Sequence, residues 1–276
     1  MRRTSADARP SPAPHRSPRR RGHPLSPAPH PLSDRATRKV RAVADHHRPT
    51  LGELRHVESC TLSARAIGTV AGIFAAVVAV LAFNGSVLQV VAFALAMGLV
   101  LAVVLRFVAS EKLLVLDRGL VVGSFGPFMT PYAVPYADVV APSVSAIVGT
   151  QRPVTLLKAD QGASATNRTA LWSLRSVTFV GPTAEVSRTF TRTGTWQPQP
   201  GKQDLWVFSV RGARRQEILV HELATALVRS GQPGAEQVLA HALPARRLRV
   251  SVADADHLRL PQRLRSTSIQ VDARVG

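Results

Sequence analysis

Two long apolar segments separated by three residues constrain the fold of this chain more than any other feature. Residues 66–83 and 87–105 contain no charged side chain. An α-helix rises about 1.5 Å per residue, so each segment would be about 27 Å long as a helix, which is close to the hydrocarbon thickness of a bilayer. The sequence therefore predicts two transmembrane helices.

The connection between the two segments is Asn84, Gly85 and Ser86, which suit a tight reversal because Asn and Gly tolerate a positive φ. We therefore predict a helical hairpin within residues 61–109. A buried hairpin of a soluble protein is the alternative, but it would need apolar elements on all sides, and the rest of the chain offers none.

Small residues recur at every fourth position of both segments and predict a close approach of the two helices. An alanine-rich composition produces the same spacing by chance, so this alternative stays open. The small residues are Gly68, Gly72 and Ala76 in the first segment and Ala94, Gly98 and Ala102 in the second.

Basic residues flank the hairpin and are absent from its turn. They are Arg55 and Arg65 before it and Arg106, Lys112 and Arg118 after it. Cytoplasmic flanks of membrane helices carry an excess of Lys and Arg. The sequence therefore predicts a multi-pass protein of the inner (cytoplasmic) membrane with both termini in the cytoplasm.

The chain is strongly basic, with a formal net charge of +18. Such an excess favours anionic lipid or nucleic acid as a partner, although the arginine bias is also typical of a GC-rich bacterial genome. We assign the Arg-rich residues 2–48 and 246–265 to anionic lipid, because a tethered chain lies beside a leaflet. Neither stretch contains an aromatic residue that could stack on bases, so we expect no specific nucleic-acid partner.

The chain divides into four parts around the hairpin. Residues 1–60 are rich in Arg and Pro and predict a disordered basic tail. Residues 110–231 predict the folded domain, and residues 232–276 a short helix followed by a basic irregular tail. The folded domain is also a candidate for binding a protein partner.

Short apolar runs separated by Gly, Pro and polar residues fill the folded domain and predict strands. A helical spacing of apolar residues follows at 214–229. We therefore predict a mainly-β domain closed by one C-terminal helix. The predicted strands are residues 113–116, 120–122, 132–136, 139–140, 144–148, 154–157, 171–180, 186–190 and 205–210.

No motif assigns a catalytic, cofactor-binding or metal-binding residue, and we expect no cofactor. His221 and Glu222 lack the second histidine of a zinc-protease motif, because Thr225 takes its place. The single Cys60 excludes an intrachain disulfide. A membrane-anchored enzyme whose site combines distant residues remains the alternative function. Its candidate residues are Asp138, Glu185 and His221.

Two further groups of polar residues have the chemistry of metal ligands but lie in stretches predicted to be irregular, where solvation or local turn formation explains them equally well. The first group is His46, His47 and His56, and the second is Asp254, Asp256 and His257.

Three segments carry a resemblance to a known family: residues 113–123 (LLVLDRGLVVG), 134–144 (VPYADVVAPSV) and 218–231 (ILVHELATALVRSG). Together with the hairpin, they resemble bacterial, actinobacterial-like membrane-anchored proteins with a pleckstrin-homology-like (PH-like) domain. The resemblance covers about residues 60–240. It implies a strongly bent sheet capped by one C-terminal helix, and no general set of catalytic residues. The expected function is a non-catalytic binding or assembly module at the membrane.

Overall fold

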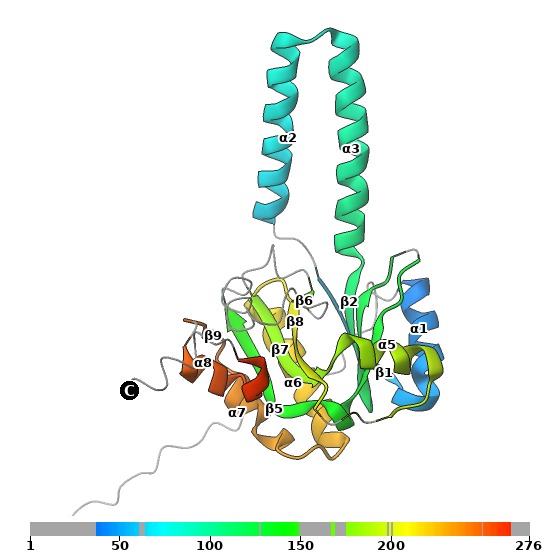
Figure 1. The fold of residues 1–276 in the computed structure, drawn as a ribbon, viewed down its shortest axis with the longest axis vertical. Helices are drawn as coiled ribbons and strands as arrows, with labels where there is room; N and C mark the ends of the chain where they lie inside the picture. The colour runs from blue at the N-terminus through cyan, green and yellow to red at the C-terminus, as the bar shows by residue number, and fades with distance from the viewer. Residues whose placement is uncertain are drawn as a thin grey trace, which may run out of the picture. The chain divides into compact units, whose positions relative to one another are not determined.

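The computed structural model combines helices and sheets (Figure 1). The predicted strand at 154–157 and most of the polar stretch after it lie outside the described residues. The structure describes residues 37–60, 64–126, 128–148, 167–168, 175–197, 199, 201–249 and 251–265.

The first sheet is an antiparallel meander in the order β1-β2-β3-β4. The predicted strands at 113–116 and 120–122 are confirmed as β2 and β3, which pair antiparallel, and β4 lies at the edge of the sheet, where its Pro135 is tolerated. The strands are β1 (Leu54–Ser59), β2 (Glu111–Leu116), β3 (Gly119–Ser124) and β4 (Tyr132–Pro135).

The second sheet has the order β6-β8-β7-β5-β9. Its three long strands, β5, β7 and β8, pair antiparallel, whereas the two-residue strands β6 and β9 pair parallel. A short 3₁₀ helix, η1 (Tyr136–Asp138), joins the two sheets. The strands are β5 (Val140–Val148), β6 (Asn167–Arg168), β7 (Arg175–Pro182), β8 (Gln203–Ser209) and β9 (Arg246–Arg247).

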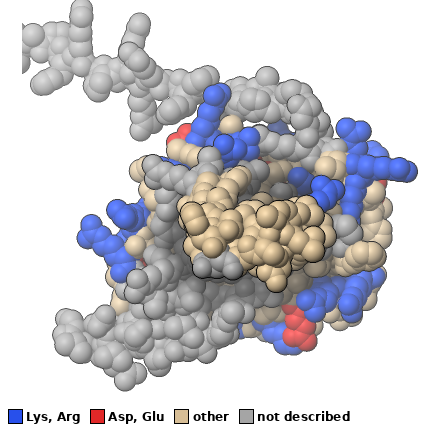
Figure 2. Space-filling view, turned by 90° about the horizontal axis from the view of Figure 1, so that it is seen from above, with Lys and Arg blue, Asp and Glu red and all other residues tan. Residues whose placement is uncertain are grey.

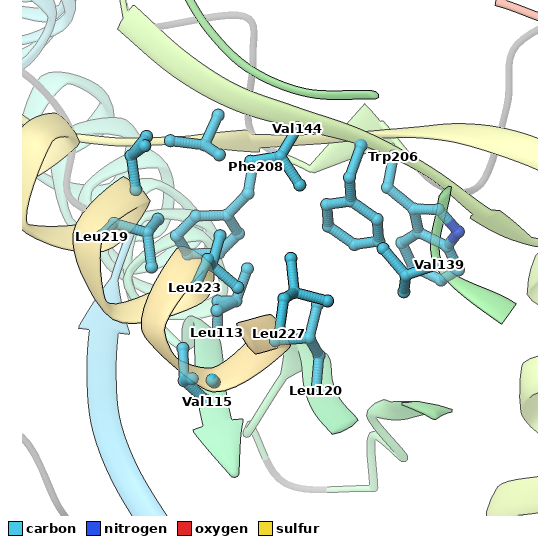
Figure 3. Packing of buried hydrophobic residues seen from close by; sticks show 14 of the residues in the cluster. Leu113, Val115, Leu120, Val139, Val144, Trp206, Phe208, Leu219, Leu223 and Leu227 are labelled. Atoms are coloured by element: carbon cyan, nitrogen blue, oxygen red, sulfur yellow. The ribbon is translucent and has the colours of Figure 1, made fainter. Parts of the chain in front are cut away.

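Helix α6 (Ala213–Arg229) packs between the inner faces of the two sheets and confirms the predicted C-terminal helix. Leu219, Leu223 and Leu227 repeat every fourth residue, so they lie on one face of the helix. Figure 3 shows this face directed toward Phe208 of the second sheet and Leu113 of the first. The 3₁₀ helix η4 (Ala235–Gln237) and α7 (Val238–Ala242) pack into the same core. They confirm the short helix that was predicted after residue 232.

The N-terminal helix α1 (Arg38–Leu51) covers the outer face of the first sheet. Its buried residues are Val40, Ala44, His47 and Leu51, and this spacing of three or four gives the helix one apolar face. The prediction of a disordered tail through residue 60 is therefore wrong for α1 and β1. The abundant Arg and Pro of the tail concealed an amphipathic helix whose partner, the outer face of β2 and β3, exists only in the folded protein.

The C-terminal segment covers the outer face of the second sheet. It contains α8 (Val252–His257) and the 3₁₀ helix η5 (Gln262–Leu264). The prediction of an irregular basic tail is wrong here, because the leucines of this segment meet the apolar outer face of β5, β7 and β8. The buried leucines are Leu248, Leu258, Leu260 and Leu264.

Helix α5 (Ala184–Thr193) stands where a strand was predicted over residues 186–190, so that prediction is wrong. The side chain of Thr183 accepts a hydrogen bond from the Val186 backbone N–H (3.4 Å), and this cap starts a helix. Val186 and Phe190, four residues apart, are buried by it. With α1, α5 and α8 present, the domain is a mixture of helices and sheets rather than a mainly-β domain with one helix.

The two apolar segments form the consecutive helices α2 (Ala64–Asn84) and α3 (Val87–Ala109), which lie side by side (Figure 1). Val87–Arg106 is long and apolar enough to cross a membrane, whereas the described apolar part of α2, Ile67–Phe83, is shorter. Large apolar side chains are exposed along both helices.

Gly68 and Gly72 of α2 do not form the predicted close contact with α3. A Cβ atom added at Gly68 or Gly72 would meet no atom within 4 Å, and one added at Gly98 would lie 3.9 Å from the Phe74 ring. The prediction of a close small-residue contact is therefore wrong at Gly68 and Gly72.

Candidate functional site

A buried carboxylate, Glu58, and a buried lysine, Lys112, lie where β1 ends at Ser59 and β2 begins at Glu111, which we call the hairpin end of the domain. These two residues flank the stretch that contains α2 and α3, and Ser59 is paired with Lys112 in the sheet. The Cys60 backbone N–H donates to the Glu111 carbonyl oxygen at 2.9 Å, so the pairing continues to the base of the helices. The two apolar helices are therefore an insertion between neighbouring strands.

Glu58 is the most deeply buried carboxylate of the hairpin end, with 1 % of its side chain exposed. One oxygen lies 3.7 Å from Arg215 Nη1 of α6, and the other lies 3.4 Å from His56 Nε2. A buried charge requires such partners, because desolvation of an isolated carboxylate is strongly unfavourable. The contact with Arg215 also places the N-terminus of α6 at the hairpin end.

Lys112 is buried and donates from Nζ to Ser59 Oγ at 2.9 Å, across the β1–β2 pair. The hydrogen bond joins the two strands at the point where the chain leaves for α2 and returns from α3. It therefore supports the base of the insertion.

Gln216 of α6 connects the hairpin end to the second sheet. Its Nε2 atom donates to the carbonyl oxygens of Ile147 (3.0 Å) and Ser176 (2.6 Å), and its Oε1 atom accepts from Arg175 Nη1 (3.2 Å). All these atoms belong to strand ends or to the first turns of α6, so they fix the helix against the sheet. The arrangement is that of a rigid support rather than of a nucleophile beside a base.

The three residues of the alternative enzyme hypothesis do not share a buried pocket. Glu185 on α5 and His221 on α6 are both exposed. Asp138 in η1 is half-buried, and burial raises the pKa of its carboxyl group above the ordinary value. A water-excluded site combining all three residues is therefore not formed.

The histidines with ligand chemistry lie apart in the fold. His46 and His47 are neighbours in α1, with ring centroids 4.9 Å apart, whereas His56 lies in β1 beside Glu58. Burial, followed by the charge of His46, lowers the pKa of His47 to about 4, so its ring is neutral at pH 7. Within the described ranges, no three His, Cys, Asp or Glu side chains form a cluster that could hold a metal ion.

Asp254 is a structural carboxylate that the sequence had assigned to a solvated stretch. It is buried, accepts from Arg246 Nε (3.1 Å) and from the Arg249 backbone N–H (2.6 Å), and forms a capping box with Ser251 at the start of α8. Ser251 and Asp254 have the spacing of a capping box, and this sequence pattern could have predicted the start of α8.

His257, at the end of α8, stacks on His241 of α7 with ring centroids 4.4 Å apart. Burial first, and then the charges of His241 and Arg246, lower the pKa of His257 to about 4. His241 Nε2 lies 2.7 Å from the His257 carbonyl oxygen, so the pair joins α7 to α8. Its role is to attach the C-terminal segment to the domain.

Comparison of the chain with protein-family models finds no match, and neither curated proteins nor solved structures give one.

Proposed function

We propose that this chain is an integral membrane protein in which α2 and α3 form a transmembrane hairpin, and that its folded domain is a non-catalytic binding or assembly module on the cytoplasmic side. The observation that carries the proposal is the exposure of large apolar side chains along both helices, from Ile67 to Val104. Soluble proteins rarely expose a continuous apolar surface of this extent. A bilayer would cover it.

The lengths of the helices fit this role. Helix α2 has 21 residues and α3 has 23. At about 1.5 Å per residue both exceed the roughly 30 Å of a hydrocarbon core. The turn between them carries no charge, whereas Arg55, Arg106 and Arg118 lie near the other ends. This asymmetry supports an orientation with both termini in the cytoplasm of a bacterial cell.

The position of the insertion supports an even number of membrane crossings. The chain leaves the domain after Ser59 and returns before Lys112, and these two residues are paired in the first sheet. A single crossing would separate the paired strands by the thickness of the membrane. Two crossings return the chain to its starting point.

The order of elements supports a PH-like domain. A four-stranded meander is followed by three long antiparallel strands, β5, β7 and β8, and then by α6, which packs between the two sheets. The resemblance implied one strongly bent sheet capped by a C-terminal helix; two sheets that enclose α6 are compatible with it, with α5 as an addition between β7 and β8. In this proposal, the domain presents a binding surface beside the membrane.

Anionic lipid is the partner that the charge distribution supports best. Arg246 and Arg265 contact Asp254 and Asp256, so these two arginines contribute to the fold. Among the other arginines of the C-terminal segment, Arg247, Arg249 and Arg259 are exposed. Each basic residue near an anionic leaflet contributes about 1 kcal/mol to attraction.

Reporter fusions test the membrane topology. A phosphatase that is active only in the periplasm should be active when inserted at Gly85 and inactive at the C-terminus, and a reporter that requires the cytoplasm should give the opposite pattern. The full chain should also stay in the membrane pellet after an alkaline wash. A periplasmic C-terminus, or release of the chain by the wash, would refute the proposal.

A further inference from the structure

The loop between β3 and β4 carries an apolar side chain that the folded domain does not cover. Phe125, at the start of the loop, is buried in the core against α1, whereas Phe128 is fully exposed and Met129 is about half exposed (47 %). Outside α2 and α3, the other large apolar side chains exposed in the described part of the chain are Val228 and Leu239. Neither of those is as exposed as Phe128.

This loop lies at the hairpin end of the domain. Ser124, the last residue of β3, pairs with Glu111, the first residue of β2. The Phe125 backbone N–H donates to the Ser110 carbonyl oxygen at 2.9 Å, and the hydroxyl oxygens of Ser110 and Ser124 are 2.6 Å apart. Ser110 directly follows α3, so the loop begins beside the residue that joins the membrane helix to the domain.

The tip of the loop is within reach of the membrane surface. Phe128 is three residues beyond Phe125, and an extended chain spans about 3.3 Å per residue, so its backbone lies at most about 10 Å from that of Phe125, at the base of α3. The interfacial region of a bilayer has a similar thickness, because apolar side chains of peripheral proteins enter it to about 5–10 Å.

The loop is held in a defined conformation. Lys39 of α1 donates from Nζ to the carbonyl oxygens of Gly126 and Met129, the latter at 3.2 Å. The Gly126 backbone N–H donates to Ser124 Oγ at 3.3 Å. Phe128 has a φ of 62°, a conformation that is unfavourable for a bulky residue. No neighbour in the described part of the chain covers the ring in return.

Basic side chains surround this end of the domain. Figure 2, a view along α2 and α3, shows Lys and Arg on several sides of the apolar helices and few Asp or Glu. Arg38 lies beside Lys39, and Arg211 and Arg214 precede or begin α6, whose first turns the contacts of Arg215 and Gln216 place at the hairpin end. Arg38, Arg211 and Arg214 are exposed. Exposed cations beside an exposed apolar tip match the headgroup region of an anionic leaflet.

We propose that Phe128 and Met129 insert into the leaflet from which α3 emerges, and that the neighbouring cations bind its anionic headgroups. The inference rests on the proposed membrane hairpin and adds a second, peripheral contact to it. The β3–β4 loop thereby fixes the rotation of the domain about the helices, which the short connections at Cys60 and Ser110 do not determine by themselves.

Tryptophan quenching by brominated lipid tests the insertion in the full chain, reconstituted into phosphatidylcholine vesicles with a varied share of phosphatidylglycerol. The Phe128→Trp variant keeps a large aromatic ring at the tip. Val228→Trp is the matched control, because Val228 is exposed at the C-terminal end of α6, away from the hairpin end. We compare the quenching of each variant with that of the wild-type chain.

The proposal predicts that lipid brominated near the headgroup removes most of the emission added by Phe128→Trp, and little of that added by Val228→Trp. The quenching should increase with the phosphatidylglycerol content. Equal quenching of the two variants would overturn the inference. If the emission added by Phe128→Trp is blue-shifted but unquenched, the loop lies against protein and the inference is overturned too. Quenching that is independent of phosphatidylglycerol would overturn the role of the cations.

Failure of the two proposals can be distinguished in the same samples. If the chain is lost from the vesicles after an alkaline wash, the transmembrane hairpin is refuted. If the chain is retained but Phe128→Trp is not quenched, only the insertion of the loop is refuted.

Discussion

Leucine side chains have opposite surroundings in the folded domain and in the helical pair. Leu113 and Leu116 in β2 are completely buried, whereas Leu95 and Leu99 in α3 are 70 % and 68 % exposed. The hydrophobic effect disfavours the second arrangement in water as strongly as it favours the first. The domain buries its leucines in its own apolar interior, whereas α2 and α3 expose theirs, and the bilayer that we propose would cover them.

The two regions also differ in how they are connected. The sheets, α1, α6 and α8 pack through three clusters of buried side chains. The helical pair joins this unit through a short stem, where Ser59 and Lys112 are paired. We therefore expect the domain to fold without the helices, and the comparison of the two regions leads to three predictions.

The largest effect is expected from removal of the helical pair. Replacement of residues 61–109 by a short Gly-Ser turn keeps the Ser59–Lys112 pairing, because Cys60 and Ser110 remain to close the ladder. A hairpin turn needs only a few residues. We expect most of the shortened chain to move from the membrane fraction to the supernatant, with only the weak peripheral contact of the β3–β4 loop and the cations left, and to unfold in one cooperative thermal transition.

The full chain, treated in parallel, is the control for this experiment. A shortened chain that still sediments with membranes would show that the domain itself carries a strong membrane anchor. A shortened chain without a cooperative transition would show that the domain needs the helices to fold. Either result would contradict the expectation that the helices provide the main membrane anchor and that the domain folds without them.

A smaller effect is expected from the same substitution in both regions. Leu223→Ala removes a side chain of α6 that is 1 % exposed, and the cavity should lower the free energy of unfolding of the domain by about 2–5 kcal/mol. Leu99→Ala, on the exposed face of α3, should change it by less than about 0.5 kcal/mol. Thermal unfolding of both variants of the full chain in the same detergent measures the difference. Equal losses would contradict a lipid-facing position for Leu99.

The smallest effect is a pH dependence confined to the domain. The Asp117 carboxylate accepts from Arg55 Nε at 2.5 Å and from the Glu53 backbone N–H at 2.8 Å. The hydrogen bond from Arg55, followed by that from Glu53, lowers the pKa of Asp117 below its ordinary value. A depressed folded-state pKa contributes stability at neutral pH, and this stability is lost as the pH falls through about 4 and below.

Asp117→Asn removes this titration and keeps one acceptor oxygen. The melting temperature of the variant should therefore fall less between pH 7 and pH 3 than that of the wild-type chain. Residues 67–105 contain no titratable side chain, so the apolar helices should add nothing to the pH dependence. An unchanged difference between pH 7 and pH 3 would show that the Asp117 contact contributes no net stability.

Sequence patterns that are local and complete predicted their elements well. The uncharged stretches became α2 and α3, the spacing of Leu219, Leu223 and Leu227 predicted α6, and the apolar runs around Asp117 predicted β2 and β3. In each case the pattern covers the whole element and does not depend on a distant partner.

The errors fall where a short or polar element is stabilised mainly by a distant surface. Helix α1 is rich in Arg and His, and its Val40 and Leu51 are buried only because β2 and β3 have two apolar faces. The same holds for α8, whose neighbour Leu258 packs on the outer face of the second sheet. The apolar residues of β2, β3 and β8 follow one another without alternating with polar residues. This pattern indicates that both faces of each sheet are covered.

The sequence by itself determined that this chain contains two uncharged apolar helices. The length and the apolar composition of residues 66–83 and 87–105 are local properties, which do not depend on contacts with the rest of the chain. The tertiary structure alone decided that these helices are inserted between two paired strands and that the stretches before β1 and after α7 belong to the domain. It also decided that Phe125 is buried while Phe128 is exposed, although the two rings are only three residues apart. The physical reason is that burial depends on surfaces assembled from distant parts of the chain, whereas helix formation and charge are local properties of the sequence.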